Sequence, residues 1–298
     1  MAKIYRWARL AEHAPWLANF AMQAPGLASL SKWIGGIDQR RSMPAFAARP
    51  FRKHFHPSHA SGEPVMLWPD TFNNYFRPET ALAAVRLLEA AGYAVVIPDA
   101  PLCCGRPLYD WGYLDEAKAL WEKTFETLGQ TIADGIPIIG LEPACTSAFM
   151  DELPRLFPKR KEAARLSKQV VHFTDFVNRN LDRFPKPRQG GRALVQAHCH
   201  HHAVVGFKPE LELLGRLGIE VERPPQGCCG MAGAFGFATE TYDVAQAIGE
   251  RVLLPAVRKA PSDTLIVADG FSCREQIKQG TGRDPIHITE LLAERMLA

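Results

Sequence analysis

The chain has 298 residues, of which 47% are hydrophobic and 22% are charged, as in an ordinary globular protein with a large core. The first 30 residues scatter charges and prolines, which excludes a signal peptide or a spanning helix in that stretch. We therefore predict a cytoplasmic location, with peripheral attachment to the inner membrane face as an alternative. In that reducing compartment seven cysteines point to metal binding or redox chemistry, not to disulfides.

Residues 1–60 are expected to form a helical arm that is interrupted at Pro15 and Pro25 and shows no recognisable chemistry. The arm carries nine Lys and Arg residues against Glu12 and Asp38, a net charge of +7, while the whole chain carries +3. A basic arm suits an acidic docking partner or an anionic membrane surface, although a solvated helical face explains the same pattern. No nucleic-acid-binding motif accompanies these charges, so we expect no nucleic-acid partner.

From Val65 onward the sequence alternates strand-like and helix-like segments, and the second half repeats the first. In the first half we expect strands at 65–68, 93–97 and 137–141 and helices at 78–91 and 114–132. In the second half we expect strands at 192–196, 219–221 and 264–268 and helices at 209–217 and 242–257. Self-similarity of this kind indicates an internal duplication.

The alternation predicts an α/β fold with two pseudo-symmetric repeats, each a small parallel sheet flanked by helices and preceded by the helical arm. The expected boundaries are 1–60 for the arm, 61–184 for the first repeat and 192–298 for the second. A Pro- and Gly-rich linker lies between the repeats. Ligands of parallel sheets bind at the carboxyl ends of the strands, so the cysteines that follow these strands should face one another across a cleft.

Each repeat contains the tripeptide Cys-Cys-Gly and a later cysteine, 42 positions on in the first repeat and 45 in the second. The second repeat has four cysteines: Cys199, Cys228, Cys229 and Cys273. Four thiolates suffice for tetrahedral zinc or for a cubane iron–sulfur cluster, which needs one per iron. Buried apolar packing accounts for single cysteines, but two vicinal pairs with spaced partners favour an inorganic centre.

The first repeat has three cysteines, Cys103, Cys104 and Cys145, because Thr71 stands where the second repeat has Cys199. Asp70 or Glu142 is near enough in sequence to supply an oxygen ligand. Two interpretations stay open. This half is either a degenerate copy kept for packing, or it holds a zinc ion or part of a shared cluster.

Four histidines surround Cys199 in the segment His198-Cys-His-His-His202. A histidine beside a cluster cysteine can ligate, transfer protons or hydrogen-bond to a sulfide. We name His200 and His201 as candidates for proton transfer, against the simpler interpretation of a polar loop. His172 and His287 are expected to be ordinary surface or core residues.

Several local motifs together carry a family resemblance: Leu67-Trp-Pro-Asp-Thr-Phe, Leu102-Cys-Cys-Gly-Arg-Pro-Leu-Tyr-Asp, Leu141-Glu-Pro-Ala-Cys, His198-Cys-His-His, Gly227-Cys-Cys-Gly-Met-Ala-Gly and Ala268-Asp-Gly-Phe-Ser-Cys-Arg. The chain resembles the cysteine-rich (CCG) domain family, which includes the B subunit of heterodisulfide reductase, the iron–sulfur subunits of glycolate and lactate oxidases, and the C subunit of anaerobic glycerol-3-phosphate dehydrogenase. The resemblance is greater to the C-terminal part of fused FAD-linked iron–sulfur D-2-hydroxyacid dehydrogenases. In the fullest family pattern each half has a fifth cysteine, and here Glu142 and Gly270 occupy those positions.

The resemblance implies an electron-transfer subunit or domain of a lactate, glycolate or 2-hydroxyglutarate dehydrogenase. A 4Fe-4S cluster on Cys199, Cys228, Cys229 and Cys273 would pass electrons to a quinone or another acceptor. The sequence shows no flavin-binding pattern and no ferredoxin module. FAD and the ferredoxin-type clusters are therefore expected on a flavoprotein partner and an iron–sulfur partner, or on other domains. The alternatives are a thiol–disulfide reductase component and a zinc-stabilised scaffold.

Overall fold

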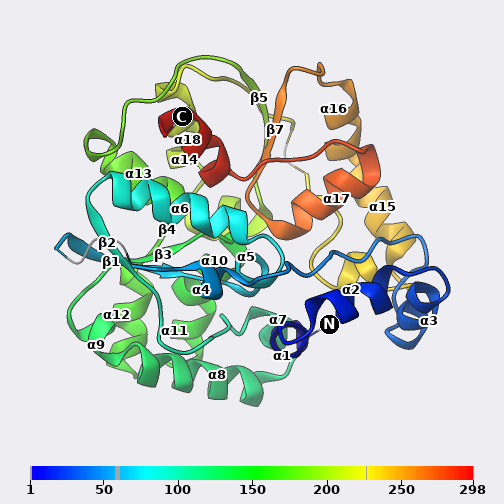
Figure 1. Cartoon of the computed structure of the whole chain (residues 1–298), viewed down its shortest axis with the longest axis horizontal. Helices are drawn as coiled ribbons and strands as arrows, with labels where there is room; N and C mark the ends of the chain where they lie inside the picture. The colour runs from blue at the N-terminus through cyan, green and yellow to red at the C-terminus, as the bar shows by residue number, and fades with distance from the viewer. Residues whose placement is uncertain (1, 58–60, 226, 298) are drawn as a thin grey trace.

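The computed structural model describes residues 2–57, 61–225 and 227–297, and their strands form two parallel sheets with helices around them (Figure 1). The first sheet has the order β2-β1-β3-β4 and the second has the order β6-β5-β7. The strands are β1 (Glu63–Trp68), β2 (Tyr93–Val96), β3 (Ile138–Gly140), β4 (Val170–His172), β5 (Arg192–Gln196), β6 (Glu220–Glu222) and β7 (Leu265–Ala268). The expected α/β class with two small parallel sheets is confirmed.

The two sheets share one topology, as the internal duplication predicted. In each, the first strand lies between the second and the third, with every neighbouring pair parallel. A helix joins the first two strands in both halves, α6 (Pro78–Ala90) in the first and α14 (Lys208–Arg216) in the second. Each Cys-Cys-Gly tripeptide follows the second of these strands. At the place that β4 occupies beside β3, the second sheet has only a single parallel bridge, between Val267 of β7 and Ile286.

The central strands read as continuous apolar runs because both faces of each sheet are covered. Val65 to Trp68 of β1 and Ala193 to Gln196 of β5 are all buried. A single core cluster contains Val65 and Leu67 from the first sheet together with Val195 and Val267 from the second. In this shared core α6 packs against α18 (Ile288–Met296), and α13 (Phe173–Arg179) packs against α14. The two repeats are therefore joined through an apolar layer of helices.

Two expected helices are each divided in the structure. The helix expected at 114–132 consists of α8 (Leu114–Thr127) and α9 (Gly129–Ala133), which meet at Leu128. The helix expected at 242–257 consists of α15 (Tyr242–Arg251) and α16 (Leu253–Lys259). Pro255 lies in the first turn of α16, where no backbone N–H is needed, and the chain leaves the helical region at Val252 (φ −142°, ψ −60°).

The remaining helices cover the outer surfaces and carry several of the cysteines. They are α4 (Phe51–His54), α5 (Thr71–Tyr75), α7 (Arg106–Asp110), α10 (Pro143–Ser147), α11 (Leu153–Leu156), α12 (Lys161–Gln169) and α17 (Phe271–Thr281). Short π-helical segments span Ala148–Glu152 and His201–Val205, and 3-10 turns span Leu181–Arg183 and Phe235–Phe237. Cys145 lies in α10 and Cys273 lies in the first turn of α17.

The N-terminal arm forms three helices that bury little of their apolar surface: α1 (Ile4–Ala11), α2 (Pro15–Gln23) and α3 (Leu27–Ile34). The helices α2 and α3 contain no buried residue. After α3 the chain runs to the second repeat, where the N–H of Asp38 donates to the carbonyl of Phe237 over 2.8 Å. In the described ranges no helix is both long and apolar enough to cross a bilayer.

Each Cys-Cys-Gly tripeptide ends in a glycine that no other residue can replace without strain. Gly105 and Gly230 have φ values of +76° and +87°. A Cβ at Gly105 would lie 2.8 Å from Nε1 of Trp121 in α8, and one at Gly230 would lie 2.0 Å from the carbonyl oxygen of Ala245 in α15. These close approaches fix both cysteine loops against helices.

We expect Gly230→Ala to destabilise the protein far more than Gly233→Ala, its matched control. Gly233 also has a positive φ, of +61°, but a Cβ there would meet nothing within 4 Å. The control should cost about 1 kcal/mol for the backbone conformation alone, and Gly230→Ala should add the cost of displacing α15. Urea unfolding followed by circular dichroism measures both, and equal shifts would show that α15 does not constrain the loop.

Candidate metal-binding site

The four cysteines of the second repeat come together at the carboxyl ends of its strands. Cys199 follows β5, Cys228 and Cys229 follow β6, and Cys273 follows β7. Each thiol lies near the next, in the order Cys199, Cys228, Cys229, Cys273, and these neighbours shift the pKa of the first three. The backbone N–H of Gly230 also donates to Sγ of Cys228 over 3.3 Å. The structure thus places four sulfur donors at one end of the second sheet, and their role as cluster ligands stays a prediction.

Hydrogen bonding within this set favours a thiolate at Cys228. The thiols of Cys199 and Cys229 and the N–H of Gly230 lower the pKa of Cys228. The pKa of Cys199 is raised by the hydrogen bond to Cys228 and by burial. Metals bind the thiolate form of cysteine, and a loop that already stabilises one thiolate suits that role. Four sulfur donors fit an iron–sulfur cluster with one cysteine per iron.

The first repeat contains the matching set with one sulfur replaced by a hydroxyl. The Thr71 hydroxyl donates to Sγ of Cys103 over 3.9 Å, where the second repeat pairs Cys199 with Cys228. Cys103 hydrogen-bonds to Cys104, which hydrogen-bonds to Cys145, and all three are buried. The hydrogen bond from Cys104 lowers the pKa of Cys145, but burial and the nearby carboxylates outweigh this effect. The pKa of Cys145 is raised to about 12 as a result. Whether these three thiols bind metal stays a prediction.

The two carboxylates considered as oxygen ligands are both engaged within the fold. Asp70 caps α5, where Oδ1 accepts from the N–H groups of Phe72 and Asn73 over 2.9 and 3.1 Å. Glu142 Oε2 accepts from the N–H of Phe271 in the second repeat over 2.8 Å. Burial and the charge of Asp70 raise the pKa of Glu142 to about 8. A ligand role for either residue stays a prediction.

A histidine fills the space beside the position where the family pattern has a fifth cysteine. A Cβ at Gly270 would lie 2.3 Å from Cδ2 of His198. Burial lowers the pKa of His198 to about 3, so its ring is neutral, and its Nδ1 accepts from the N–H of His200. The ring of His198 lies near Cys228, and the charge of the Cys228 thiolate partly offsets the effect of burial on the pKa of His198. The sequence marked this departure at Gly270 but not the residue that occupies the space.

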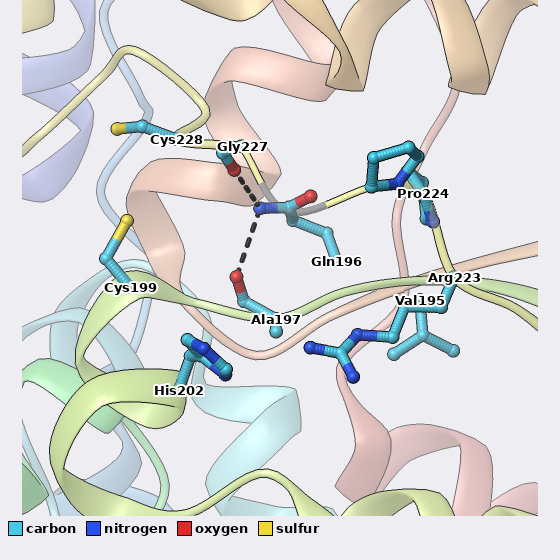
Figure 2. Close-up of a pocket in the computed structure, with 10 residues that line it drawn as sticks. Val195, Gln196, Ala197, Cys199, His202, Arg223, Pro224, Gly227 and Cys228 are labelled. Carbon is cyan, nitrogen blue, oxygen red and sulfur yellow. Dashed lines mark hydrogen bonds between the residues drawn. The ribbon is translucent and has the colours of Figure 1, made fainter.

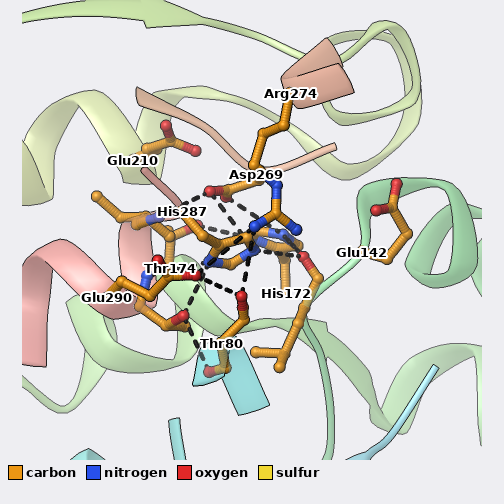
Figure 3. A network of polar contacts seen from close by, with 12 residues as sticks. Thr80, Glu142, His172, Thr174, Glu210, Asp269, Arg274, His287 and Glu290 are labelled. Atoms are coloured by element: carbon orange, nitrogen blue, oxygen red, sulfur yellow. Dashed lines mark hydrogen bonds and ion pairs between the residues drawn. The ribbon is translucent and has the colours of Figure 1, made fainter. Parts of the chain in front are cut away.

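The other histidines of the loop separate into two environments. Burial lowers the pKa of His200 to about 4, and its ring stacks on His198 at a centroid distance of 5.3 Å. His201 points inward to a buried polar cluster with His172, Asp269 and Glu210, part of which is shown in Figure 3. A proton-transfer role for His200 or His201 stays a prediction. The sequence did not identify the cluster, although His172 and Asp269 each stand at or just after the end of a buried strand.

The N-terminal segment supplies a charge to the site that sequence reasoning missed. Arg41 is 1% exposed, and its Nε donates to the carbonyl of Gly236 over 2.6 Å. Its guanidinium lies 4.8 Å from the ring centroid of Tyr242 and interacts electrostatically with Cys229. A fixed positive charge beside sulfur ligands stabilises a negatively charged centre.

A cavity of about 260 Å³ opens beside Cys199 and Cys228 (Figure 2). Its wall includes Arg223 and Gln196. Nε2 of Gln196 donates to the carbonyls of Ala197 and Gly227, each over 3.1 Å, and so ties the end of β5 to the cysteine loop. The junction between the repeats, where a cleft was expected, is filled by the buried side chains of Figure 3. The cavity therefore lies within the second repeat and not between the two repeats.

The two parallel sheets, each with a Cys-Cys-Gly loop at its carboxyl end, define a class of protein in which two repeats present cysteines suited to binding a metal centre. The cysteine-rich domain (CCG) family model matches residues 70–150 and 207–278, and the chain belongs to this family. This membership supports an iron–sulfur cluster at its cysteines.

Three relatives illustrate the range of similarity. The C subunit of the anaerobic glycerol-3-phosphate dehydrogenase of Escherichia coli (strain K12) is 28% identical over 87% of this chain and 67% of its own length. D-2-hydroxyglutarate dehydrogenase of Pantoea ananatis is 25% identical over 99% of this chain but only 30% of its own length. Lactate utilization protein A of Bacillus subtilis is 28% identical over 78% of this chain and 99% of its own length.

We expect alkylation of the cluster-free protein to distinguish the two cysteine sets. Under anaerobic conditions iodoacetamide should modify Cys228 first, because this thiol is partly exposed and has a lowered pKa. The buried Cys103, Cys104 and Cys145 should react slowly. Peptide mass spectrometry measures the order, and urea-unfolded protein is the control in which all seven should react alike. Early modification of the first-repeat cysteines would contradict the burial seen here.

Proposed function

We propose that this chain is the electron-transfer component of a flavin-dependent D-2-hydroxyacid dehydrogenase of the lactate, glycolate or 2-hydroxyglutarate class. The observation that carries the proposal is the row of four sulfur donors at Cys199, Cys228, Cys229 and Cys273. These residues would hold a 4Fe-4S cluster, which supplies reversible uptake of one electron when bound. The named relatives, a dehydrogenase subunit, a dehydrogenase and a lactate utilization protein, support the class of reaction.

The residues around the cysteines would set the properties of the bound centre. Arg41 would favour the reduced state, because each added electron makes the centre more negative. The N–H of Gly230 and the ring of His198 would bind and orient sulfur. The hydride from the hydroxyacid would be received by FAD on a partner, since this chain has no flavin-binding pattern.

The cavity beside Cys199 and Cys228 is the place where we position the electron acceptor. Apolar walls from Val195, Ala197 and Pro224 suit a quinone ring, and the Arg223 guanidinium suits an acceptor oxygen. His202 is the histidine that lines this cavity, and the neutral ring of His200, beside Cys199, stays our candidate for proton transfer.

The exposed apolar face of the N-terminal arm is the surface on which we dock the electron-donating flavoprotein. Trp16 and Trp33 are 73% and 75% exposed, and the arm also exposes Trp7, Leu10, Leu17, Phe20, Leu27, Leu30 and Ile34. A patch of this kind marks an interaction surface. Lys3 and Arg6 both pair with Glu116, so part of the arm's positive charge is neutralised within the chain. The D-2-hydroxyglutarate dehydrogenase match extends over 99% of this chain, arm included, within a protein more than three times as long. In that relative the additional length would hold the electron donor, and we propose that an equivalent donor contacts this face of the arm.

Thiol–disulfide chemistry is the second candidate, because the partly exposed Cys228 has a lowered pKa and hydrogen-bonds to Cys199. In this reaction Cys228 would attack a disulfide, one sulfur would leave as a thiolate, and Cys199 would resolve the mixed disulfide. A bound cluster that persists when disulfides are added would argue against it.

The metal content of anaerobically purified protein tests the proposal. We expect about four iron atoms and four sulfides per chain, with an EPR signal that changes on dithionite reduction. Cys229→Ser should remove the signal, and Cys104→Ser, the equivalent change in the first repeat, should leave it in place. Zinc without sulfide would favour the zinc-stabilised scaffold instead. Hydroxyacid oxidation by this chain alone would contradict the need for a flavoprotein.

Replacing Trp16 and Trp33 with Ser should slow electron transfer from the flavoprotein without changing the cluster. Removing buried aromatic anchors typically costs more than about 1 kcal/mol each, which should raise the KM for this chain by roughly tenfold or more. Leu297→Ser is the control, since Leu297 is exposed and directly follows α18, which lies on the far side of the molecule from α2 and α3 (Figure 1). Unchanged kinetics combined with loss of binding to anionic lipid vesicles would assign the face to a membrane instead.

A further inference from the structure

The strongest unassigned feature is the buried polar cluster where the two repeats meet. His172, at the end of β4, comes from the first repeat, and His201 and Asp269 come from the second. One ring nitrogen of each histidine and one oxygen of Asp269 all lie within 4.8 Å of one another. None of the three side chains is more than 2% exposed. These residues lie outside the two cysteine sets.

Several atoms in this cluster have no hydrogen-bond partner among the described residues. They are Nε2 of His201, Oδ2 of Asp269 and Oε2 of Glu210. Glu210 is also buried, and its Oε2 lies 3.4 Å from Nδ1 of His201. Leaving a buried polar atom unpaired costs about 1–3 kcal/mol, and more for a charged group. Two of these unpaired atoms belong to His201 and Asp269 of the three-residue group, which indicates that a ligand binds there.

The hydrogen bonds of His172 allow its ring proton to lie on either nitrogen. Its Nδ1 lies 2.9 Å from Oγ1 of Thr174, a hydroxyl that can either donate or accept. Its Nε2 lies 3.3 Å from the carbonyl of Leu141 and 3.7 Å from Oδ2 of Asp269. An ion bound at Nε2 would require the proton to lie on Nδ1, and the carbonyl of Leu141 would then keep His287 as its donor. Burial lowers the pKa of His172 to about 4, which keeps the ring neutral as a metal ligand must be.

The neighbouring His287 differs because a backbone N–H donates to its Nδ1 and so fixes its proton on Nε2. Its Nδ1 accepts from the N–H of Thr289 over 3.1 Å, at the start of α18. Its Nε2 therefore carries the proton, which faces the carbonyl of Leu141 at 3.2 Å. His287 is thus excluded as a ligand although it lies 3.6 Å from Asp269.

We propose that His172, His201 and Asp269 bind a divalent transition cation such as Zn²⁺, and that this ion links the two repeats. Two neutral imidazoles and a carboxylate are ligands that zinc prefers. Zinc bonds of about 2.0–2.1 Å place tetrahedral ligands about 3.3–3.4 Å apart. Nε2 of His172 and Oδ2 of Asp269 are 3.7 Å apart and the three ligand atoms lie within 4.8 Å of one another, so the side chains would move slightly inward around the ion. Glu210 would accept the Nδ1 proton of His201 and orient its ring.

The charges of the cluster balance when the ion is present. Asp269 and Glu210 carry two negative charges when ionised, which a divalent cation neutralises. The guanidinium of Arg274 also acts on Asp269, but it is paired with Glu290 over 3.6 Å. Without a cation the buried carboxyls must hold protons, and burial does raise the pKa of Asp269 to about 7. Binding of the ion would release these protons to solvent.

The test measures zinc in protein whose cysteines already hold the iron–sulfur cluster. After dialysis against Zn²⁺ and then buffer, we expect about one zinc per chain. Its X-ray absorption should show a nitrogen and oxygen shell at about 2.0–2.1 Å and no sulfur shell at about 2.3 Å. A sulfur shell, or no retained zinc, would overturn the proposal without reference to any variant.

Four variants assign the ion to these residues. His172→Asn and Asp269→Asn should each lower Zn²⁺ affinity by more than about 100-fold, and Glu210→Gln by about 10–100-fold. His287→Asn is the matched control, because Asn also caps helices, and it should retain zinc. Zinc retained by His172→Asn and Asp269→Asn would contradict the site.

Iron and sulfide are measured in the same samples. Their retention in His172→Asn keeps a failure of this inference separate from a failure of the proposed cluster.

Discussion

The close approach of each Cys-Cys-Gly backbone to a helix is the constraint on which the cysteine sites depend. Gly230 meets the carbonyl of Ala245, and Gly105 meets the ring of Trp121, whose Nε1 also donates to the carbonyl of Cys104 over 2.7 Å. A positive φ at these glycines turns the chain sharply after the vicinal thiols. The thiols are thereby held at the strand ends, where the later cysteine of each repeat reaches them.

The duplication kept this geometry in both repeats but changed the chemistry of one position. Thr71 in the first repeat stands where Cys199 stands in the second, and its hydroxyl still contacts the next thiol. A hydroxyl is a poor substitute for a thiolate toward soft metals. The second repeat also gains Arg41 from the arm, whose charge interacts with Cys229. The buried Arg106 near Cys104 is instead paired with Glu152 and Asp110. Both differences favour the second repeat as the place where charge changes.

The sequence predicted those features that depend on local pattern and repetition. Periodicity and spacing predicted where the strands lie along the chain and that a helix begins at Pro78. They also predicted that Cys199 and Cys228 follow strands of the same sheet. The cluster of His172, His201 and Asp269 did not, because it forms between repeats and no local signal encodes the contact. The strand β4 was also missed, because its three residues lie directly between α12 and α13 with no turn residues to mark them. The charge of Arg41 was hidden for the same reason as the cluster, since its partners lie some 200 positions away.

The junction between the repeats gives the first repeat a structural role that does not require a metal of its own. The N–H of Phe271 donates to Glu142, and the Phe271 ring stacks on Phe72 at a centroid distance of 4.3 Å. Phe271 begins α17, which carries Cys273, and Glu142 directly precedes α10, which carries Cys145. The same hydrogen bond therefore fixes the starts of both cysteine-bearing helices. Any movement of Cys273 on a change of charge would strain the first repeat, so that repeat limits reorganisation around the second, as electron transfer requires.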